Sequence, residues 1–248
     1  MSVPDLYDSI GRSYAERRRP DPRIAAQIND AIGAAQRVVN VGAGAGSYEP
    51  ADRNVVAVEP STVMIGQRQA GSAPVVRATA EALPFADEVF DAALAVLTVH
   101  HWSDKAGGLA EMRRVARKCV VLCFDLALEQ QLWLVREYFP EIATLDYGRA
   151  LSPEDIADNI RATRIDVVPV PWDCIDGFLG AYWRRPDAYL DVAVRASISG
   201  LAQLDQSIVD RGIARLQADL DSGDWSRRHA DLLARDELDL GYRLVVSE

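Results

Sequence analysis

The amino-acid sequence predicts an α/β fold in which a mostly parallel sheet carries helices on both faces. Short β-branched or apolar runs alternate with helical patterns, which is typical of βαβ units. The run over 92–97 is apolar throughout, as expected of a strand that is covered on both sides. The chain has 248 residues, of which 49% are hydrophobic, enough for one domain over 1–248 with a full core.

The predicted elements follow from local signals. One helix is predicted over 5–19 and a second from Pro22, with Asp21 as its N-cap, and together they form a predicted N-terminal helical lid over 1–36. Ser103 or Asp104 starts a later helix. Pro50 limits the connection between the first two strands to a turn or two of helix. The predicted strands cover 37–41, 55–58, 75–76, 90–99, 119–124, 165–170 and 242–246.

Composition excludes several classes of partner. A net charge of −10 argues against a nucleic-acid backbone. No apolar run is long enough to cross a membrane, and the N-terminal stretch lacks the pattern of a signal peptide. The three cysteines contain no CxxC pair, so neither a disulfide framework nor a metal site is predicted. The sequence therefore predicts a cytoplasmic protein with no nucleic-acid, membrane or metal partner.

A glycine-rich turn follows the first strand as Gly42, Gly44 and Gly46, and Glu59 ends the second strand. Glycines let the backbone approach a ligand closely, and an acidic residue at that place can hold a ribose hydroxyl pair. The combination predicts an adenosine-containing cofactor. A tight structural turn is the alternative explanation of the glycines alone.

Longer segments narrow the prediction. The run ATAEALPFADEVFDAALAVLTVHHW over 78–102, with VVNVGAGAGSYEP, VVAVEPS and LAEMRRVARKCVVLCFD, closely resembles the small-molecule branch of the class I S-adenosylmethionine (SAM) dependent methyltransferases. The resemblance covers roughly residues 5–125. It implies a Rossmann-like seven-stranded sheet, mostly parallel with an antiparallel last strand. It also implies methyl transfer from SAM to O, N or C of a small molecule, leaving S-adenosylhomocysteine (SAH).

The resemblance also implies a set of cofactor contacts. The turn lies under the methionine part of SAM, Glu59 holds the ribose, Leu97 and Thr98 line the pocket near the methyl group, and Tyr14 closes over it. Three residues rim the adenine, and Leu83 packs on it opposite the Pro60–Met64 segment. The implied cofactor residues are Tyr14, Asn40, Gly42, Ala43, Gly44, Gly46, Glu59, Pro60, Met64, Thr79, Ala80, Glu81, Leu83, Leu97 and Thr98.

Two departures from the family pattern keep alternatives open. Asn40 stands where the family usually has Asp, and Thr79 where it often has Asp, which implies weaker SAM binding. A SAM-binding protein without methyl transfer is therefore one alternative. An NAD-dependent oxidoreductase is another, although the third glycine comes one residue early for the G-x-G-x-x-G fingerprint.

Candidate bases follow the fourth and fifth predicted strands. Alignment of the acceptor with the methyl group supplies most of the catalysis, and a base is required only if the acceptor loses a proton. His100, His101 and Asp125 are the candidates, because ends of parallel strands face the ligand crevice. The alternative for the histidines is packing at a helix start beside Trp102, and for Asp125 a solvated loop acid.

About 70 residues separate Val170 from Tyr242, too many for a structureless loop. A helical cap is predicted as an insertion over 171–240 between the last two strands, forming either the acceptor pocket or a homodimer surface. The alternative is that its aromatic residues build only its own core, and that its arginines pair with nearby acids. The candidate acceptor contacts are Trp102, Trp172, Trp183 and Arg184.

Overall fold

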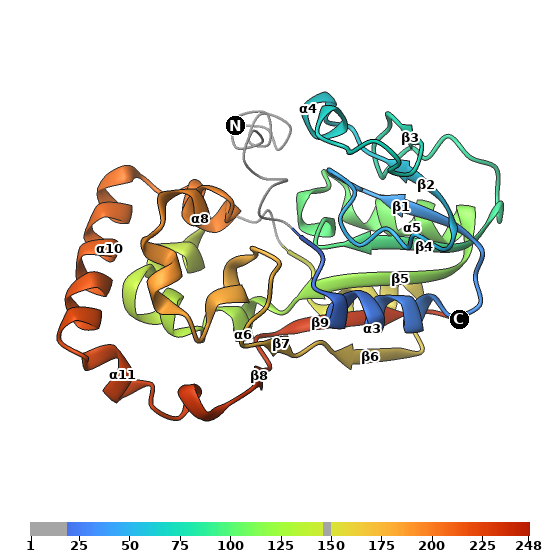
Figure 1. The fold of residues 1–248 in the computed structure, drawn as a ribbon. Helices are drawn as coiled ribbons and strands as arrows, with labels where there is room; N and C mark the ends of the chain where they lie inside the picture. The colour runs from blue at the N-terminus through green and yellow to red at the C-terminus, as the bar shows by residue number, and fades with distance from the viewer. Residues whose placement is uncertain (1–18, 146–149) are drawn as a thin grey trace.

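The computed structural model describes residues 19–145 and 150–248, so Tyr14 and the helix predicted over 5–19 lie outside the described residues. Seven strands form one sheet in the order β3-β2-β1-β4-β5-β9-β6 (Figure 1). The first five pair in parallel, and β9 runs antiparallel to both of its neighbours, as predicted. The strands of the sheet are β1 (Arg37–Val41), β2 (Asn54–Val58), β3 (Val75–Val76), β4 (Phe90–Val96), β5 (Ala116–Phe124), β6 (Arg164–Val167) and β9 (Tyr242–Val246).

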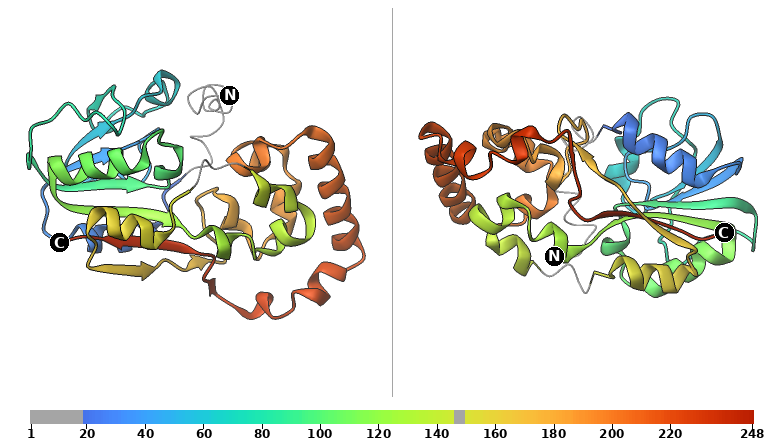
Figure 2. Two further views of the ribbon diagram at one scale, coloured as in Figure 1. Left: turned by 180° about the vertical axis from the view of Figure 1, so that it is seen from behind. Right: turned by 90° about the horizontal axis from the view of Figure 1, so that it is seen from below.

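Helices cover both faces of this sheet (Figure 2). Alternate residues of each strand point to opposite faces, which gives two buried clusters. Helix α3 (Pro22–Ile32) contributes to one cluster, while α5 (Lys105–Val115) and α7 (Pro153–Ile160) contribute to the other. Continuous apolar strands are therefore required, because neither face of the central strands meets water.

The helix starts follow the predicted caps. The Asp21 carboxylate accepts a hydrogen bond from Arg23 N, with Pro22 in the first turn of α3. The Asp104 carboxylate likewise accepts from Gly107 N at the start of α5. The buried face of α3 carries Ile24, Ile28 and Ile32 and packs on the sheet. Residues 22–32 of the predicted lid therefore belong to a helix that covers the sheet.

The connection from β1 to β2 contains turns and no helix, unlike the turn or two of helix that was predicted. The backbone has a positive φ at Gly42, Gly44, Gly46 and Tyr48. Alternation of left-handed residues with ordinary ones prevents the repeated right-handed geometry that a helix needs. The chain instead forms a tight turn at the end of β1, and β2 leads into the short helix α4 (Thr62–Gly66).

Two segments build the cap, which lies to one side of the sheet with α10 at its far edge (Figures 1 and 2). One follows β5 over 126–145, and the other follows β6 over 168–241. The insertion predicted over 171–240 falls within the second segment, and the first segment packs with it. Val170, predicted in a sheet strand, lies in a separate two-stranded sheet. The cap elements are α6 (Leu126–Glu129), a π-helix (Leu134–Tyr138), β7 (Val170–Pro171), α8 (Val192–Ala196), α9 (Ser199–Ala202), α10 (Gln206–Asp221), α11 (Asp224–Arg228), β8 (Glu237–Leu238) and the 3-10 helices Pro140–Thr144, Leu179–Tyr182, Pro186–Leu190 and Leu232–Ala234.

The cap has an aromatic core centred on Trp133, which comes from its first segment. The Trp133 ring lies edge-on to Tyr189 and Trp225, with centroid separations of 5.7 and 5.1 Å. Its indole N–H donates to the carbonyl of Trp183 at 2.8 Å. Edge-to-face pairs of this kind stabilise beyond the area that they bury. The two segments therefore fold as one unit.

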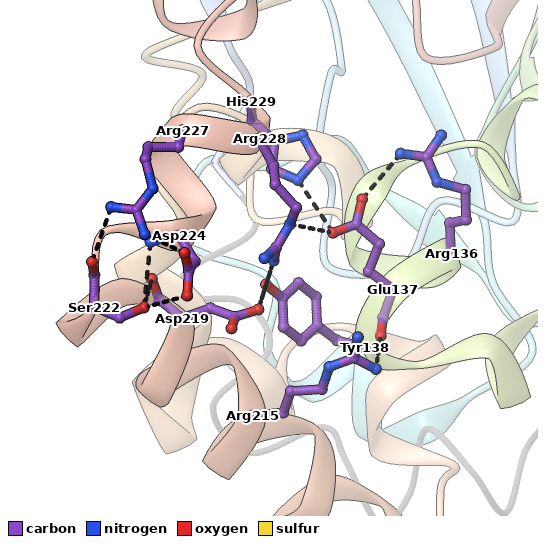
Figure 3. A network of polar contacts seen from close by, with 10 residues as sticks. All are labelled: Arg136, Glu137, Tyr138, Arg215, Asp219, Ser222, Asp224, Arg227, Arg228 and His229. Atoms are coloured by element: carbon purple, nitrogen blue, oxygen red, sulfur yellow. Dashed lines mark hydrogen bonds and ion pairs between the residues drawn. The ribbon is translucent and has the colours of Figure 1, made fainter.

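A polar network fastens the outer side of this unit (Figure 3). Glu137 of the π-helix contacts Arg228 and His229 at 3.4 and 3.2 Å. Asp219 of α10 accepts hydrogen bonds from Tyr138 at 2.6 Å and from Arg228 at 2.5 Å. The Arg228 side chain is 41% exposed, so water screens its ion pairs and each adds little stability alone. Together they fix the π-helix against α10 and α11.

Candidate active site

The carboxyl ends of β1, β2, β4 and β5 lie together at one edge of the sheet, where parallel α/β sheets bind ligands. The glycine turn leaves β1 there, and the N–H groups of Gly42 and Ala43 both donate to the Val58 carbonyl, which fixes the turn to β2. Gly42 has φ +70°, and a Cβ there would lie 2.2 Å from Thr98 Oγ1. Glycine is required at this residue by conformation and by the approach of β4.

Glu59 at the end of β2 is buried and contacts the turn. Its carboxylate accepts hydrogen bonds from Gly44 N at 2.8 Å and from Ser61 N at 2.9 Å. Burial raises the pKa of Glu59, and the two backbone hydrogen bonds act in the opposite direction. Each carboxylate oxygen keeps a second lone pair, so both can still accept from a ligand hydroxyl.

The surroundings of the turn fit the polar groups of SAM. Asn40 is 1% exposed, and within residues 19–145 and 150–248 its Oδ1 has no hydrogen-bond partner, which leaves a buried acceptor beside the turn. Met64 of α4 is buried, and its terminal methyl would lie 3.2 Å from a Cβ at Gly44. Ala43 is also buried, and the half-buried Pro60 carbonyl accepts from Arg77. Acceptors for an ammonium group and for hydroxyls thus stand next to a small, glycine-lined surface.

The residues expected at the adenine are held by the protein itself. Thr79 is exposed, whereas Ala80 and Leu83 are buried in the core cluster of α5. The Glu81 carboxylate accepts from the N–H groups of Ser103 and Asp104, and ties this segment to the start of α5. Burial raises the pKa of Glu81, but these hydrogen bonds lower it on balance. The contact of these four residues, Thr79, Ala80, Glu81 and Leu83, with adenine stays a prediction.

A pocket opens at the ends of β4 and β5. Leu97 has a positive φ of 49°, a costly conformation for a leucine that is found where other contacts enforce it, often at functional sites. Cys123 is one wall residue, and burial raises the pKa of its thiol to about 12, so it stays protonated. The pocket is lined by Leu97, Thr98, Val99, His100, Leu122, Cys123, Phe124, Ala150, Leu151 and Ile156.

Of the three candidate bases, the structure places only His100 among these lining residues. Its ring lies 3.7 Å from that of His101 and 5.0 Å from that of Phe124, measured between centroids. His101 shares the short 3-10 helix Val99–His101. Asp125 caps α6, and one of its carboxylate oxygens accepts from Ala127 N at 2.9 Å. The geometry therefore favours His100 for contact with an acceptor.

The four candidate acceptor contacts lie elsewhere. Trp183 is fully buried in the cap core, where its indole N–H donates to Val170 O at 3.0 Å. Trp102 is buried against Gly108 of α5. Trp172 is exposed, and the Arg184 guanidinium lies 4.9 Å above its ring and donates to Arg235 O. Trp102 and Trp183 therefore have packing roles in the structure, and none of the four lines the pocket as described.

Sequence reasoning missed a buried acid on α6, the short helix that follows β5. Glu129 is 8% exposed on α6, and no hydrogen bond or ion pair in the described part of the chain reaches its carboxylate. Burial raises the pKa of Glu129 to about 7. The one available signal was its place in the run LALEQQLWLV, where an acid stands among apolar residues. A second missed feature is the contact of Glu49 with Arg68 beneath the turn.

The chain is similar in sequence to known methyltransferases. The family model described as "Methyltransferase domain" matches residues 39–124. A demethylmenaquinone methyltransferase of Renibacterium salmoninarum is 38% identical over 196 residues, which are 73% of this chain and 78% of the relative. This chain belongs to the class I SAM-dependent methyltransferases. Its cofactor is SAM, and its activity is SAM-dependent methyl transfer.

Two solved structures are similar in fold to this methyltransferase. A proposed methyltransferase from an antibiotic biosynthesis pathway of Anabaena variabilis superposes with TM-score 0.86 and 33% identity, covering 94% of this chain and 99% of that chain. A geranyl diphosphate C-methyltransferase from Streptomyces coelicolor, in complex with Mg²⁺, geranyl diphosphate and SAH, shares the fold at TM-score 0.51 and 12% identity, covering 90% of this chain and 77% of that chain. Within the described residues of the methyltransferase, no helix has the length and apolar character needed to cross a membrane.

Proposed function

We propose that this methyltransferase methylates a small molecule whose reacting atom lies at the ends of β4 and β5, beside the pocket there. The position of the pocket carries the proposal: it lies where β4 and β5 end, Thr98 in its wall approaches Gly42 of the turn, and His100 is the titratable ring among its lining residues. The net charge of −10 disfavours a nucleic-acid acceptor. The relative named for demethylmenaquinone is consistent with an apolar ring compound. The three buried, free cysteines suit the reducing cytoplasm.

The proposed roles follow from position. Glu59 holds the ribose hydroxyls, the glycine turn and Asn40 lie beside the methionine part, and Leu97 and Thr98 separate cofactor from acceptor. Bound SAM supplies a sulfonium methyl group that is already activated toward in-line attack. His100 accepts the acceptor's proton, while His101 and Asp125 keep its surroundings in place.

Replacing Glu59 with Ala tests the proposed cofactor site. We expect the wild-type protein to bind SAM and not NADH in a calorimetric titration. The variant should bind SAM at least about 30-fold more weakly, because it loses charge-assisted hydrogen bonds of about 2 kcal/mol. Glu237→Gln, at an exposed residue of β8, is the control and should bind normally. Unchanged affinity of Glu59→Ala would disprove this placement of SAM.

Replacing His100 with Gln separates binding from transfer. We expect SAH affinity to stay within about twofold of the wild-type value, and SAH release with a panel of hydroquinone and phenol acceptors to fall about 100-fold, as for loss of a general base. His101→Gln is the matched control and should fall less than tenfold. Equal losses in both variants would contradict the role given to His100.

A further inference from the structure

A buried ion pair between Arg68 and Glu49 contacts the glycine turn. Arg68 Nη2 lies 2.7 and 2.8 Å from the two carboxylate oxygens of Glu49. The two side chains are only 5% and 9% exposed. Glu49 comes shortly after the turn, and Arg68 follows α4. Arg68 Nη2 also donates to the Ala73 carbonyl at 3.1 Å, so one buried nitrogen joins the carboxylate to the segment after α4. Charge-assisted hydrogen bonds of this kind are stronger than neutral ones and restrain the segments that carry them.

The pair holds the backbone of the turn directly. Arg68 Nη1 donates to the carbonyl of Gly44 at 3.2 Å, while the N–H of Gly44 donates to Glu59 at 2.8 Å. A Cβ at Gly46 would lie 3.3 Å from both Arg68 Nη1 and Glu49 Oε2. Gly44 is therefore held at both of its polar backbone groups, and the pair packs against Gly46 as well.

Glu49 also explains the uncharged residue at position 40. Asn40 Nδ2 donates to Glu49 Oε1 at 3.3 Å, and Ala73 N donates to Glu49 Oε2 at 3.4 Å. An aspartate at position 40 would place a second carboxylate against Glu49 in a buried environment. Two like charges at this separation disfavour each other. Position 40 must donate to Glu49, and an amide does this where a carboxylate cannot.

We infer that Glu49 and Arg68 are positioning residues that hold the glycine turn in its SAM-binding shape, and that Asn40 is neutral because Glu49 already carries the negative charge there. This inference rests on the proposed placement of SAM at the turn. Asn40 stands where the family usually has Asp, and the carboxylate near the turn is supplied by Glu49. The carboxylate thus comes from the connection that follows β1 instead of from β1 itself.

The test is calorimetric titration with SAH of Asn40→Asp, Glu49→Gln and the double variant. Each single variant should bind SAH at least about tenfold more weakly, because each disturbs a buried charged contact. The double variant should bind SAH more tightly than Asn40→Asp, the weaker of the two single variants, because two carboxylates no longer face each other. It should bind no more tightly than Glu49→Gln, because Arg68 still lacks its carboxylate partner. Binding of Asn40→Asp equal to wild type, or a double variant no better than the weaker single one, would overturn the inference.

Three further variants serve as controls for the SAH titrations. Asp91→Asn removes a more exposed ion pair with Arg37 at the other end of β1 and should leave SAH binding unchanged. Glu59→Ala distinguishes the two proposals. If Glu59→Ala, Asn40→Asp and Glu49→Gln all bind SAH normally, the placement of SAM is wrong. If Glu59→Ala loses SAH binding while Asn40→Asp and Glu49→Gln bind normally, only the present inference fails. Should Asn40→Asp not fold, Arg68→Lys decides, with about fivefold weaker SAH binding expected and unchanged binding contradicting the inference.

Discussion

Replacing Glu129 with Gln should increase the free energy of unfolding by about 3 kcal/mol at pH 8. The Glu129 carboxyl is 8% exposed and has a pKa of about 7, against an ordinary value of 4.5, because burial penalises its charged form. At pH 8 the folded protein must therefore keep a buried charge without a partner. Glutamine has nearly the same shape and carries no charge, so the penalty disappears.

The pH dependence of this effect has a definite sign. Between pH 4.5 and 7 the folded protein holds a proton on Glu129 that the unfolded chain has released. Stability from this group is thus present at low pH and is lost as the pH rises through about 7. Urea unfolding at pH 4, 6 and 8 measures it, with the exposed Glu237→Gln as control. A gain from Glu129→Gln that is equal at all three pH values would contradict the assignment.

Local signals in the sequence were sufficient for the sheet and its helix starts. The β-branched run at Arg37–Val41 and the caps at Asp21 and Asp104 act over a few residues, so their outcome could be predicted. The glycines and Glu59 were likewise recognised from short spacings. The glycine turn and Glu59 lie side by side because β1 and β2 pair in parallel, and Gly44 N donates a hydrogen bond to Glu59.

Contacts between distant residues were not predictable in the same way. Trp133 and Trp183 are joined across 50 positions, and no local pattern around Trp133 indicates that it belongs to the cap. Burial of Trp183 depends on that contact, and the residues around Trp183 in the sequence do not indicate it. The pairing of Glu49 with Arg68 depends on how α4 returns to the turn, and no local pattern records it.

Replacing Gly42 with Ala should have the largest effect on the cofactor site. An alanine at φ +70° costs about 1 kcal/mol, and its Cβ would lie 2.2 Å from Thr98 Oγ1, which adds about 2 kcal/mol of overpacking. The turn or the end of β4 must move to relieve this contact. We therefore expect a loss of about 3 kcal/mol in urea unfolding and SAH binding at least about 100-fold weaker in calorimetry.

Two further variants divide this effect into its causes. Gly71 has φ +91° and open space around its Cβ position, so Gly71→Ala should show the conformational cost alone, about 1 kcal/mol, with normal SAH binding. Adding Thr98→Ala to Gly42→Ala removes the two closest atoms, Oγ1 and Cγ2, and should recover about 1–2 kcal/mol. If Gly42→Ala and Gly71→Ala lose equal stability, or if Thr98→Ala recovers none, the close approach of β4 to the turn does not constrain Gly42. The glycine would then be required by its backbone conformation alone, and the shape of the site would depend on the turn without support from Thr98.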